Sequence, residues 1–163
     1  MFKKTTIVAA LGLALSATAQ ADYRWQLDAN AGRTNIDVGR DDGDVDQFNF
    51  GGRFYFQEVD TSKGPLGEAS FLDQSSYVGA GYRYTDLDDI VEDVDGDTYG
   101  IDGRYVLPLE SIPLIFEAEW VRETPDFSDI DFYRFGFGAY LTESTTVVVS
   151  YRTSDVDESN DID

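Results

Sequence analysis

The chain has 163 residues, of which 14% are aromatic, and it carries a formal net charge of −20 with no histidine and no cysteine. The absence of both residue types excludes Ser–His hydrolysis, thiol catalysis and most zinc sites, so we do not expect an enzyme. No stretch approaches the roughly 20 consecutive apolar residues that a membrane-spanning helix requires.

The first 21 residues form a separate unit. Lys3 and Lys4 precede an apolar stretch at residues 7–15, and residues 19–21 (Ala-Gln-Ala) provide small side chains for cleavage. This is the organisation of a secretory signal peptide, and its apolar part is too short for a membrane anchor. Removing the signal lowers the basic residues from 12 to 10 against 32 acids, so the mature chain, residues 22–163, has a net charge of −22.

Seven segments of the mature chain alternate apolar and polar side chains with a period of two. In the second, the phenylalanines of residues 48–56 alternate with positions that include Asn49, Gly51 and Arg53. Successive side chains of an extended chain point to opposite faces, so this period predicts strands. The segments lie at residues 23–33, 48–56, 77–85, 99–105, 114–121, 133–141 and 145–152.

The two faces of these strands differ in the same way along the whole chain. One face, which includes Tyr23 and Trp25, is aromatic or aliphatic without charge, and the other carries arginine, carboxylates and glycine. A soluble sandwich or lipocalin-like barrel would carry lysine outside, but the mature chain has only Lys63. Arginine facing lipid near the midplane would cost about 2–4 kcal/mol. We therefore predict an all-β fold, an antiparallel up-and-down meander of about seven visible strands that forms a transmembrane outer-membrane β-barrel or part of one.

Charged side chains of the polar face are the candidate lining of a water-filled lumen. They are Arg24, Asp28, Arg53, Arg83, Asp102, Arg104, Glu117, Glu119, Arg134 and Arg152. Glu117 and Glu119 are neighbours on one strand face, which is more typical of a pore wall than of a general acid–base pair.

Aspartate-rich connections separate the predicted strands at residues 34–46, 86–97 and 123–131, and a similar tail begins at Ser154. If the N-terminus starts on the periplasmic side, all of them are extracellular, opposite tight turns at residues 110–113 and 142–144. Residues 93–97 begin like an EF-hand loop, but Thr98 and Arg104 stand where that loop needs Gly and Glu. Two interpretations of these aspartates stay open: a solvated acidic surface, or loose binding of Ca²⁺ or Mg²⁺. The candidate ligands for the second are Asp88, Asp89, Asp93, Asp95 and Asp97. No other cofactor is expected.

One long connection, residues 59–76, falls on the side of the tight turns. Gly64-Pro65 ends the strand, and residues 66–72 suit one helical turn or a packed loop. The connection contains Val-Asp-Thr-Ser, Gly-Pro-Leu, Glu-Ala and Phe-Leu, and in this it resembles the family of putative general bacterial porins. The signal peptide ending before Asp22-Tyr23 and the aromatic second strand match as well. The resemblance covers the layout of residues 1–152 and implies a porin, although for this segment we favour a structural turn without a role in transport.

Alternation ends at Tyr151, and a polar tail follows. An odd number of strands is atypical of bacterial barrels, and the resemblance implies longer chains. We therefore expect an N-terminal fragment, incomplete at its C-terminus. The alternative is an eight-stranded barrel with an unrecognised last strand.

Two functions are compatible with these patterns. The first is an outer-membrane porin, with passive diffusion of small hydrophilic solutes or ions through a charged, water-filled lumen. The second is a small non-conducting barrel whose acidic, cation-binding loops serve adhesion or envelope stability. Strand number separates them, because about eight strands fill their own interior and about sixteen leave a channel. The expected partners are outer-membrane lipid, lipopolysaccharide and the solutes. A homo-oligomer stays open, and no nucleic acid is expected.

Overall fold

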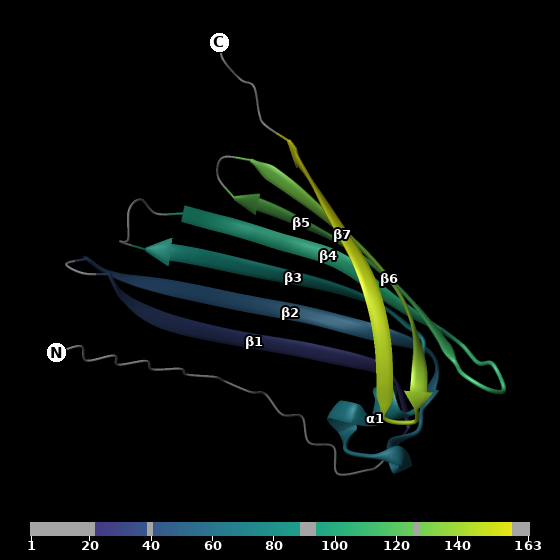
Figure 1. Ribbon diagram of the computed structural model, residues 1–163. Helices are drawn as coiled ribbons and strands as arrows, with labels where there is room; N and C mark the ends of the chain where they lie inside the picture. The colour runs from purple at the N-terminus through teal and green to yellow at the C-terminus, as the bar shows by residue number, and fades with distance from the viewer. Residues whose placement is uncertain (1–21, 39–40, 89–93, 126–127, 158–163) are drawn as a thin grey trace.

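The computed structural model describes residues 22–38, 41–88, 94–125 and 128–157, and its strands form one sheet. The strands are β1 (Tyr23–Val38), β2 (Asp41–Val59), β3 (Tyr77–Asp88), β4 (Val94–Leu107), β5 (Leu114–Pro125), β6 (Asp129–Thr142) and β7 (Thr145–Asp157). They lie in chain order, and each neighbouring pair is antiparallel. Figure 1 shows this order as a continuous colour gradient across the sheet. The predicted all-β antiparallel meander is confirmed.

The strands extend beyond the alternating segments. β2 begins at Asp41 rather than at Phe48, and Asp44 pairs with Asp88 of β3. Much of the acidic sequence that we predicted as loop is therefore hydrogen-bonded strand. Alternation marks only the stretch in which one face is apolar, whereas backbone pairing continues where both faces are polar.

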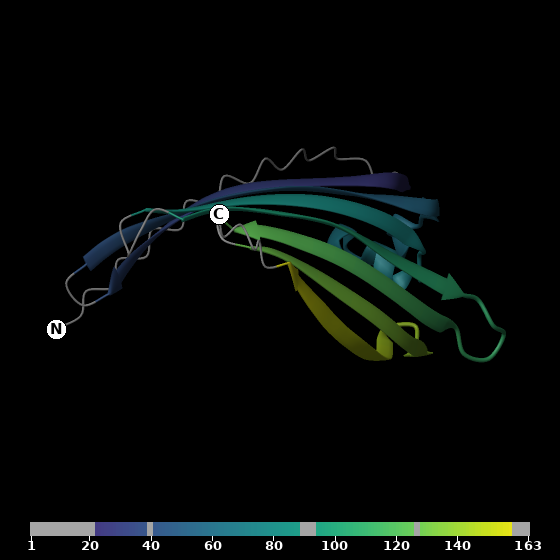
Figure 2. The ribbon, with the colours of Figure 1, turned by 90° about the horizontal axis from the view of Figure 1, so that it is seen from above.

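The sheet is arched, and a short helix, α1 (Leu66–Leu72), lies on its concave side (Figure 2). A 3₁₀ turn, η1 (Thr61–Lys63), precedes it. Figure 1 places α1 beside the turn that joins β6 to β7, at what we call the short-turn end of the sheet. Of the two alternatives for residues 66–72, a helical turn or a packed loop, the structure has the helix.

The convex face is apolar and exposed. Phe50 is 51% exposed and Val149 is 75% exposed, and the ring of Trp25 lies 4.5 Å from that of Phe54 on the neighbouring strand. An exposed apolar surface of this extent is rare on a soluble monomer and indicates contact with lipid or with another protein. No helix among the described residues is both long and apolar enough to cross a membrane.

Tyr23 departs from the predicted faces. The pairing of β1 with β2 is irregular between Tyr23 and Trp25. The ring of Tyr23 contacts that of Tyr55 edge-on, at 5.6 Å, and both pack in a cluster beside α1. The prediction that Tyr23 shares the outer face with Trp25 is wrong, because the irregular pairing interrupts the period of two.

Buried apolar side chains gather in two small clusters where α1 meets the concave face. The clusters consist of Tyr55, Val59 and Ala69, and of Val106, Ile115 and Tyr140. The apolar packing among the described residues is thus concentrated at the short-turn end, and it leaves the middle of the concave face to polar groups.

Candidate functional site

The concave face is identified by the residues that pack beneath α1. Tyr55 and Ile115 belong to those clusters, and Arg53 and Glu117 lie two positions away on the same strands. Residues two apart in a strand share a face. The strand register therefore places most of the predicted candidates on the concave side, namely Asp28, Arg53, Arg83, Asp102, Arg104, Glu117, Glu119, Arg134 and Arg152.

Arg53 of β2 and Asp102 of β4 are joined across the strand between them. Arg53 Nη2 lies 3.4 Å from Asp102 Oδ2. Gly79 of β3 is the register partner of both residues, and a Cβ at Gly79 would collide with the Asp102 carboxylate. The ion pair therefore passes over a position of β3 where no side chain obstructs it.

A second network continues the charges across β4, β5 and β6. Glu117 accepts hydrogen bonds from Arg104 Nη2 at 2.7 Å and from Arg134 Nη1 at 3.2 Å. Arg134 Nε also donates to Glu119 at 2.6 Å. The side chain of Glu117 is 11% exposed, so these bonds are largely shielded from water. We call the two groups the charge band; its members are Arg53, Asp102, Arg104, Glu117, Glu119 and Arg134.

The charges of the band alternate rather than segregate. Asp102 and Glu119 face each other in the register of β4 and β5, an arrangement of like charges that is destabilising by itself. Each carboxylate turns to an arginine on its far side, Asp102 to Arg53 and Glu119 to Arg134. The six members carry three positive and three negative charges, so the band is neutral within a strongly acidic protein.

The remaining candidates lie outside the charge band. They are Arg24, Asp28, Arg83 and Arg152. Arg83 Nε donates to Asn49 at 2.7 Å, and the guanidinium of Arg152 lies 4.6 Å from the ring centroid of Phe132. Arg24 sits at the irregular start of β1, 3.9 Å from Glu58, and is exposed. Sequence alone did not distinguish these residues from the paired ones.

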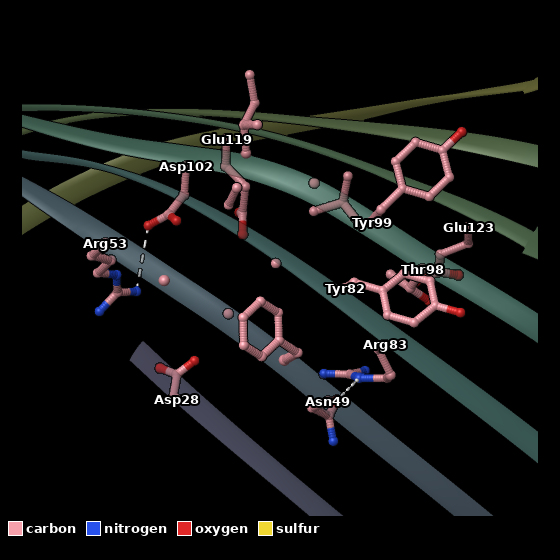
Figure 3. Close-up of a pocket in the computed structure, with 18 of the residues that line it drawn as sticks. Asp28, Asn49, Arg53, Tyr82, Arg83, Thr98, Tyr99, Asp102, Glu119 and Glu123 are labelled. Carbon is pink, nitrogen blue, oxygen red and sulfur yellow. Dashed lines mark hydrogen bonds and ion pairs between the residues drawn. The ribbon is translucent and has the colours of Figure 1, made fainter. Parts of the chain in front are cut away.

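An open groove of about 460 Å³ runs along this face beside the band. Its polar lining includes Asp28, Arg53, Arg83, Asp102, Glu119 and Arg152. In Figure 3, Arg53 and Asp102 point toward each other across the intervening strand, and Arg83 turns toward Asn49. Both signs of charge thus line one groove, which suits polar solutes and water rather than an apolar ligand.

Two residues of the site were not among the candidates predicted from the sequence. Gly79 allows the Arg53–Asp102 pair to form, and the ring of Tyr77 lies 4.6 Å from the Arg53 guanidinium as a cation–π partner. The signal for Gly79 exists, since it is an inward-facing glycine between opposite charges on the two flanking strands. Recognising it requires the register of three strands, which the sequence alone does not supply.

The structure describes only part of the predicted set of cation ligands. Asp89 and Asp93 lie outside the described residues, and so does the side chain of Asp88. Asp97 accepts a hydrogen bond from the Tyr82 hydroxyl at 2.6 Å. In the part of the chain that the structure describes, no three His, Cys, Asp or Glu side chains are placed to hold a metal ion.

Comparison with known protein families identifies a match. The model of a protein family described as "Putative general bacterial porin" matches residues 1–162, nearly the whole chain. Neither a curated protein nor a solved structure matches the chain in the two other comparisons.

Proposed function

Because the chain belongs to the family of putative general bacterial porins, we propose that its sheet forms part of the wall of a pore through which small hydrophilic solutes and ions diffuse passively. Membership implies a location in the bacterial outer membrane and favours a channel over an enzyme. The nature of the solutes and the passive mechanism are the proposed part.

One observation carries the proposal: the two faces of the same sheet suit two different solvents. The convex face exposes aromatic and aliphatic side chains, as a surface against lipid does. The concave face carries the charge band, which would be costly in hydrocarbon and is stable beside water. A wall with lipid outside and water inside accounts for both faces.

The sheet is open in this structure, so it cannot by itself form the wall of a pore. In the described structure β1 and β7 each pair on one side only. Unpaired backbone groups are not tolerated in the hydrocarbon core, so a spanning sheet must close into a barrel. The proposal therefore concerns the closed barrel to which this sheet contributes.

The alternating charges predict how such a pore would treat its solutes. Fixed groups of both signs orient water and can replace part of the hydration of a polar solute as it passes. A neutral band gives little preference between cations and anions by itself. The selectivity should then respond strongly when the balance of the band is changed.

A planar-bilayer experiment tests the proposal. The protein, purified from outer membranes and reconstituted, should produce discrete current steps. The double variant Glu117→Lys/Glu119→Lys should shift the reversal potential in a KCl gradient toward anion selectivity. The control is Glu110→Lys/Glu143→Lys, which changes the net charge equally at two exposed turn residues.

The results separate the two candidate functions. Current steps with a larger shift in the band variant than in the control support the pore. A protein that inserts into the bilayer but never conducts favours the non-conducting barrel with a surface role. Equal shifts of the reversal potential in both double variants would show that the charge band does not line the conduction path.

A further inference from the structure

The connection between β2 and β3 is much longer than antiparallel strands require. Two residues are enough for a hairpin, and Glu143 and Ser144 make the turn from β6 to β7 in this way. Residues 60–76 instead build η1 and α1 and place them on the concave face (Figure 2). The extra residues therefore have a purpose other than joining the strands.

α1 reaches across the arch rather than staying beside its own strands. The ring of Phe71 lies 5.5 Å from that of Tyr140 on β6, and the Tyr140 hydroxyl donates to the Phe71 carbonyl at 3.1 Å. Behind the helix, the backbone N–H of Val106 on β4 donates to Ser76 Oγ at 2.8 Å. Ala69, with no exposed surface, packs on Tyr55 and Val59 of β2. The connection as a whole thus links β2 to β4 and β6.

The connection is held rigidly at its base. The Asp73 carboxylate, whose side chain is 9% exposed, accepts from Lys63 Nζ at 2.6 Å, from Ser75 Oγ at 3.0 Å and from the Asp60 N–H at 3.3 Å. The backbone N–H of Asp73 closes the helix on the Ala69 carbonyl at 2.8 Å. These bonds fix the helix as one unit with η1.

The side of the helix that is not packed is exposed. Leu66 is 60% exposed although it is apolar, and Gly67 and Glu68 are exposed beside it. The packed residues Ala69 and Phe71 hold the opposite side against the sheet. The exposed side of the helix therefore faces away from the sheet.

The charge band begins immediately beside the helix clusters. Val106 and Ile115 are register partners beneath α1, and Arg104 and Glu117 are the next inward-facing pair on the same strands. On the other side of the arch, Arg53 lies over Tyr77, which packs against the cluster of Tyr55. The charge band therefore adjoins the residues beneath the helix on the same concave face.

We propose that η1 and α1 form a fixed step that narrows the passage at the short-turn end and, with the charge band, sets the size limit for solutes. This rests on the proposed pore function. A helix with its side chains is about 10 Å wide, so one lying along the wall removes a substantial part of a lumen. Glu68 and Leu66 are then the groups that a solute meets on the step.

The test removes the contact that holds the step in place. Phe71→Ala should release the helix and raise the single-channel conductance by about twofold, because a body about 10 Å wide leaves the passage. It should also admit larger polyethylene glycols into the pore. The matched control is Leu109→Ala, which shortens an exposed leucine in the turn between β4 and β5 and should leave docking and the size limit unchanged.

A readout that does not depend on conduction accompanies the test. The chain has no cysteine, so Ala69→Cys reports docking directly. A water-soluble maleimide should label it slowly in the otherwise unchanged protein and rapidly when Phe71→Ala is added, with exposed Gly67→Cys as the reference. Equal labelling at both positions in the parent protein would overturn the docked helix.

The outcomes for conduction are separable from those for docking. If Phe71→Ala frees Ala69→Cys but leaves conductance and size limit unchanged, the narrowing is wrong and the pore stands. If the parent protein and Phe71→Ala both insert without conducting, the pore function fails and the narrowing with it. If Phe71→Ala does not fold, the charge variant Glu68→Lys provides the test. It should shift the reversal potential more than Glu110→Lys does. An equal shift would show that the helix does not line the passage.

Discussion

Arg53 and Asp102 form an ion pair between strands that are not neighbours, with Gly79 of the intervening β3 beneath their contact. Neighbouring strands lie about 4.8 Å apart, so the pair bridges roughly twice that spacing. The arginine side chain is long enough to span this distance. A side chain at the middle position would stand in its way, because a Cβ there would collide with the Asp102 carboxylate. The glycine is therefore part of the site, although it has no functional group.

Replacing this glycine should disrupt the pair. Gly79→Val would place a Cβ against the Asp102 carboxylate and 3.1 Å from Arg53 Cγ, and we expect the free energy of unfolding to fall by about 1–3 kcal/mol. The control is Gly81→Val on the same strand and face, where a Cβ would meet only the Phe50 carbonyl oxygen at 3.8 Å. Urea unfolding in detergent measures both. Equal effects would show that the Arg53–Asp102 bridge does not depend on Gly79.

The two glutamates of β5 should differ in their contribution to stability. Glu117 bonds two arginines and its side chain is 11% exposed, whereas Glu119 bonds one and is 34% exposed. Glu117→Gln should destabilise the sheet by about 1–3 kcal/mol, and Glu119→Gln by less than about 1 kcal/mol. Heat-induced unfolding followed by gel mobility ranks the two variants. A larger loss for Glu119→Gln would contradict the network.

Single-cysteine labelling tests the orientation of the wall. Phe137→Cys and Val149→Cys should react with a lipid-soluble reagent, and Arg53→Cys and Arg134→Cys with a water-soluble one. The opposite pattern at Arg134→Cys would invert the assignment of β6, because a shift of one residue exchanges the two faces of a strand. Tyr23→Cys should resist the lipid-soluble reagent, since Tyr23 packs beside α1.

The stabilisation that the Lys63–Asp73 ion pair gives to the base of α1 should be lost at alkaline pH. The hydrogen bond from Lys63 to the Asp73 carboxylate raises the pKa of Lys63 above its usual value of 10.5. A raised pKa in the folded state means that the stabilisation is complete below the unfolded pKa and is lost as pH rises through the folded one. The side chain of Lys63 is 47% exposed, so we expect less than about 1 kcal/mol.

The measurement compares the parent protein with Lys63→Gln. The stability difference between them should be constant up to about pH 10 and should shrink at higher pH. The stability difference between Lys63→Arg and Lys63→Gln should persist at high pH, because arginine keeps its proton throughout this range. A difference between the parent protein and Lys63→Gln that does not change with pH would mean that the ion pair adds nothing to the docked helix.

Divalent cations should stabilise the acidic end of the sheet. Carboxylates concentrated there repel each other, and Ca²⁺ takes several oxygen ligands from such groups. We expect millimolar Ca²⁺ to raise the melting temperature in detergent, and replacement of Asp88, Asp89, Asp93 and Asp95 by Asn to weaken the effect. Monovalent salt should imitate part of it by screening. A melting curve at low ionic strength that ignores Ca²⁺ would leave these acids without a cation role.

The sequence by itself determined the strands, their order and the two faces, because alternation with a period of two is a local property of the chain. The same alternation placed the charged candidates together on one face. For residues 66–72 the sequence left both a helical turn and a packed loop open. The identity of the bonded partners needed the register: Arg53 and Asp102 are far apart in sequence, and Gly79 gains its role only between them.

Other features were decided only by the tertiary structure. The irregular pairing at the start of β1 turns Tyr23 inward although its place in the alternation predicts the outside. The docking of Phe71 on Tyr140 depends on the curvature of the sheet, which brings β6 round to a helix that follows β2. Curvature arises from all the strands together, and no single segment encodes it. Strand ends were underestimated because backbone pairing continues where both faces are polar and alternation stops.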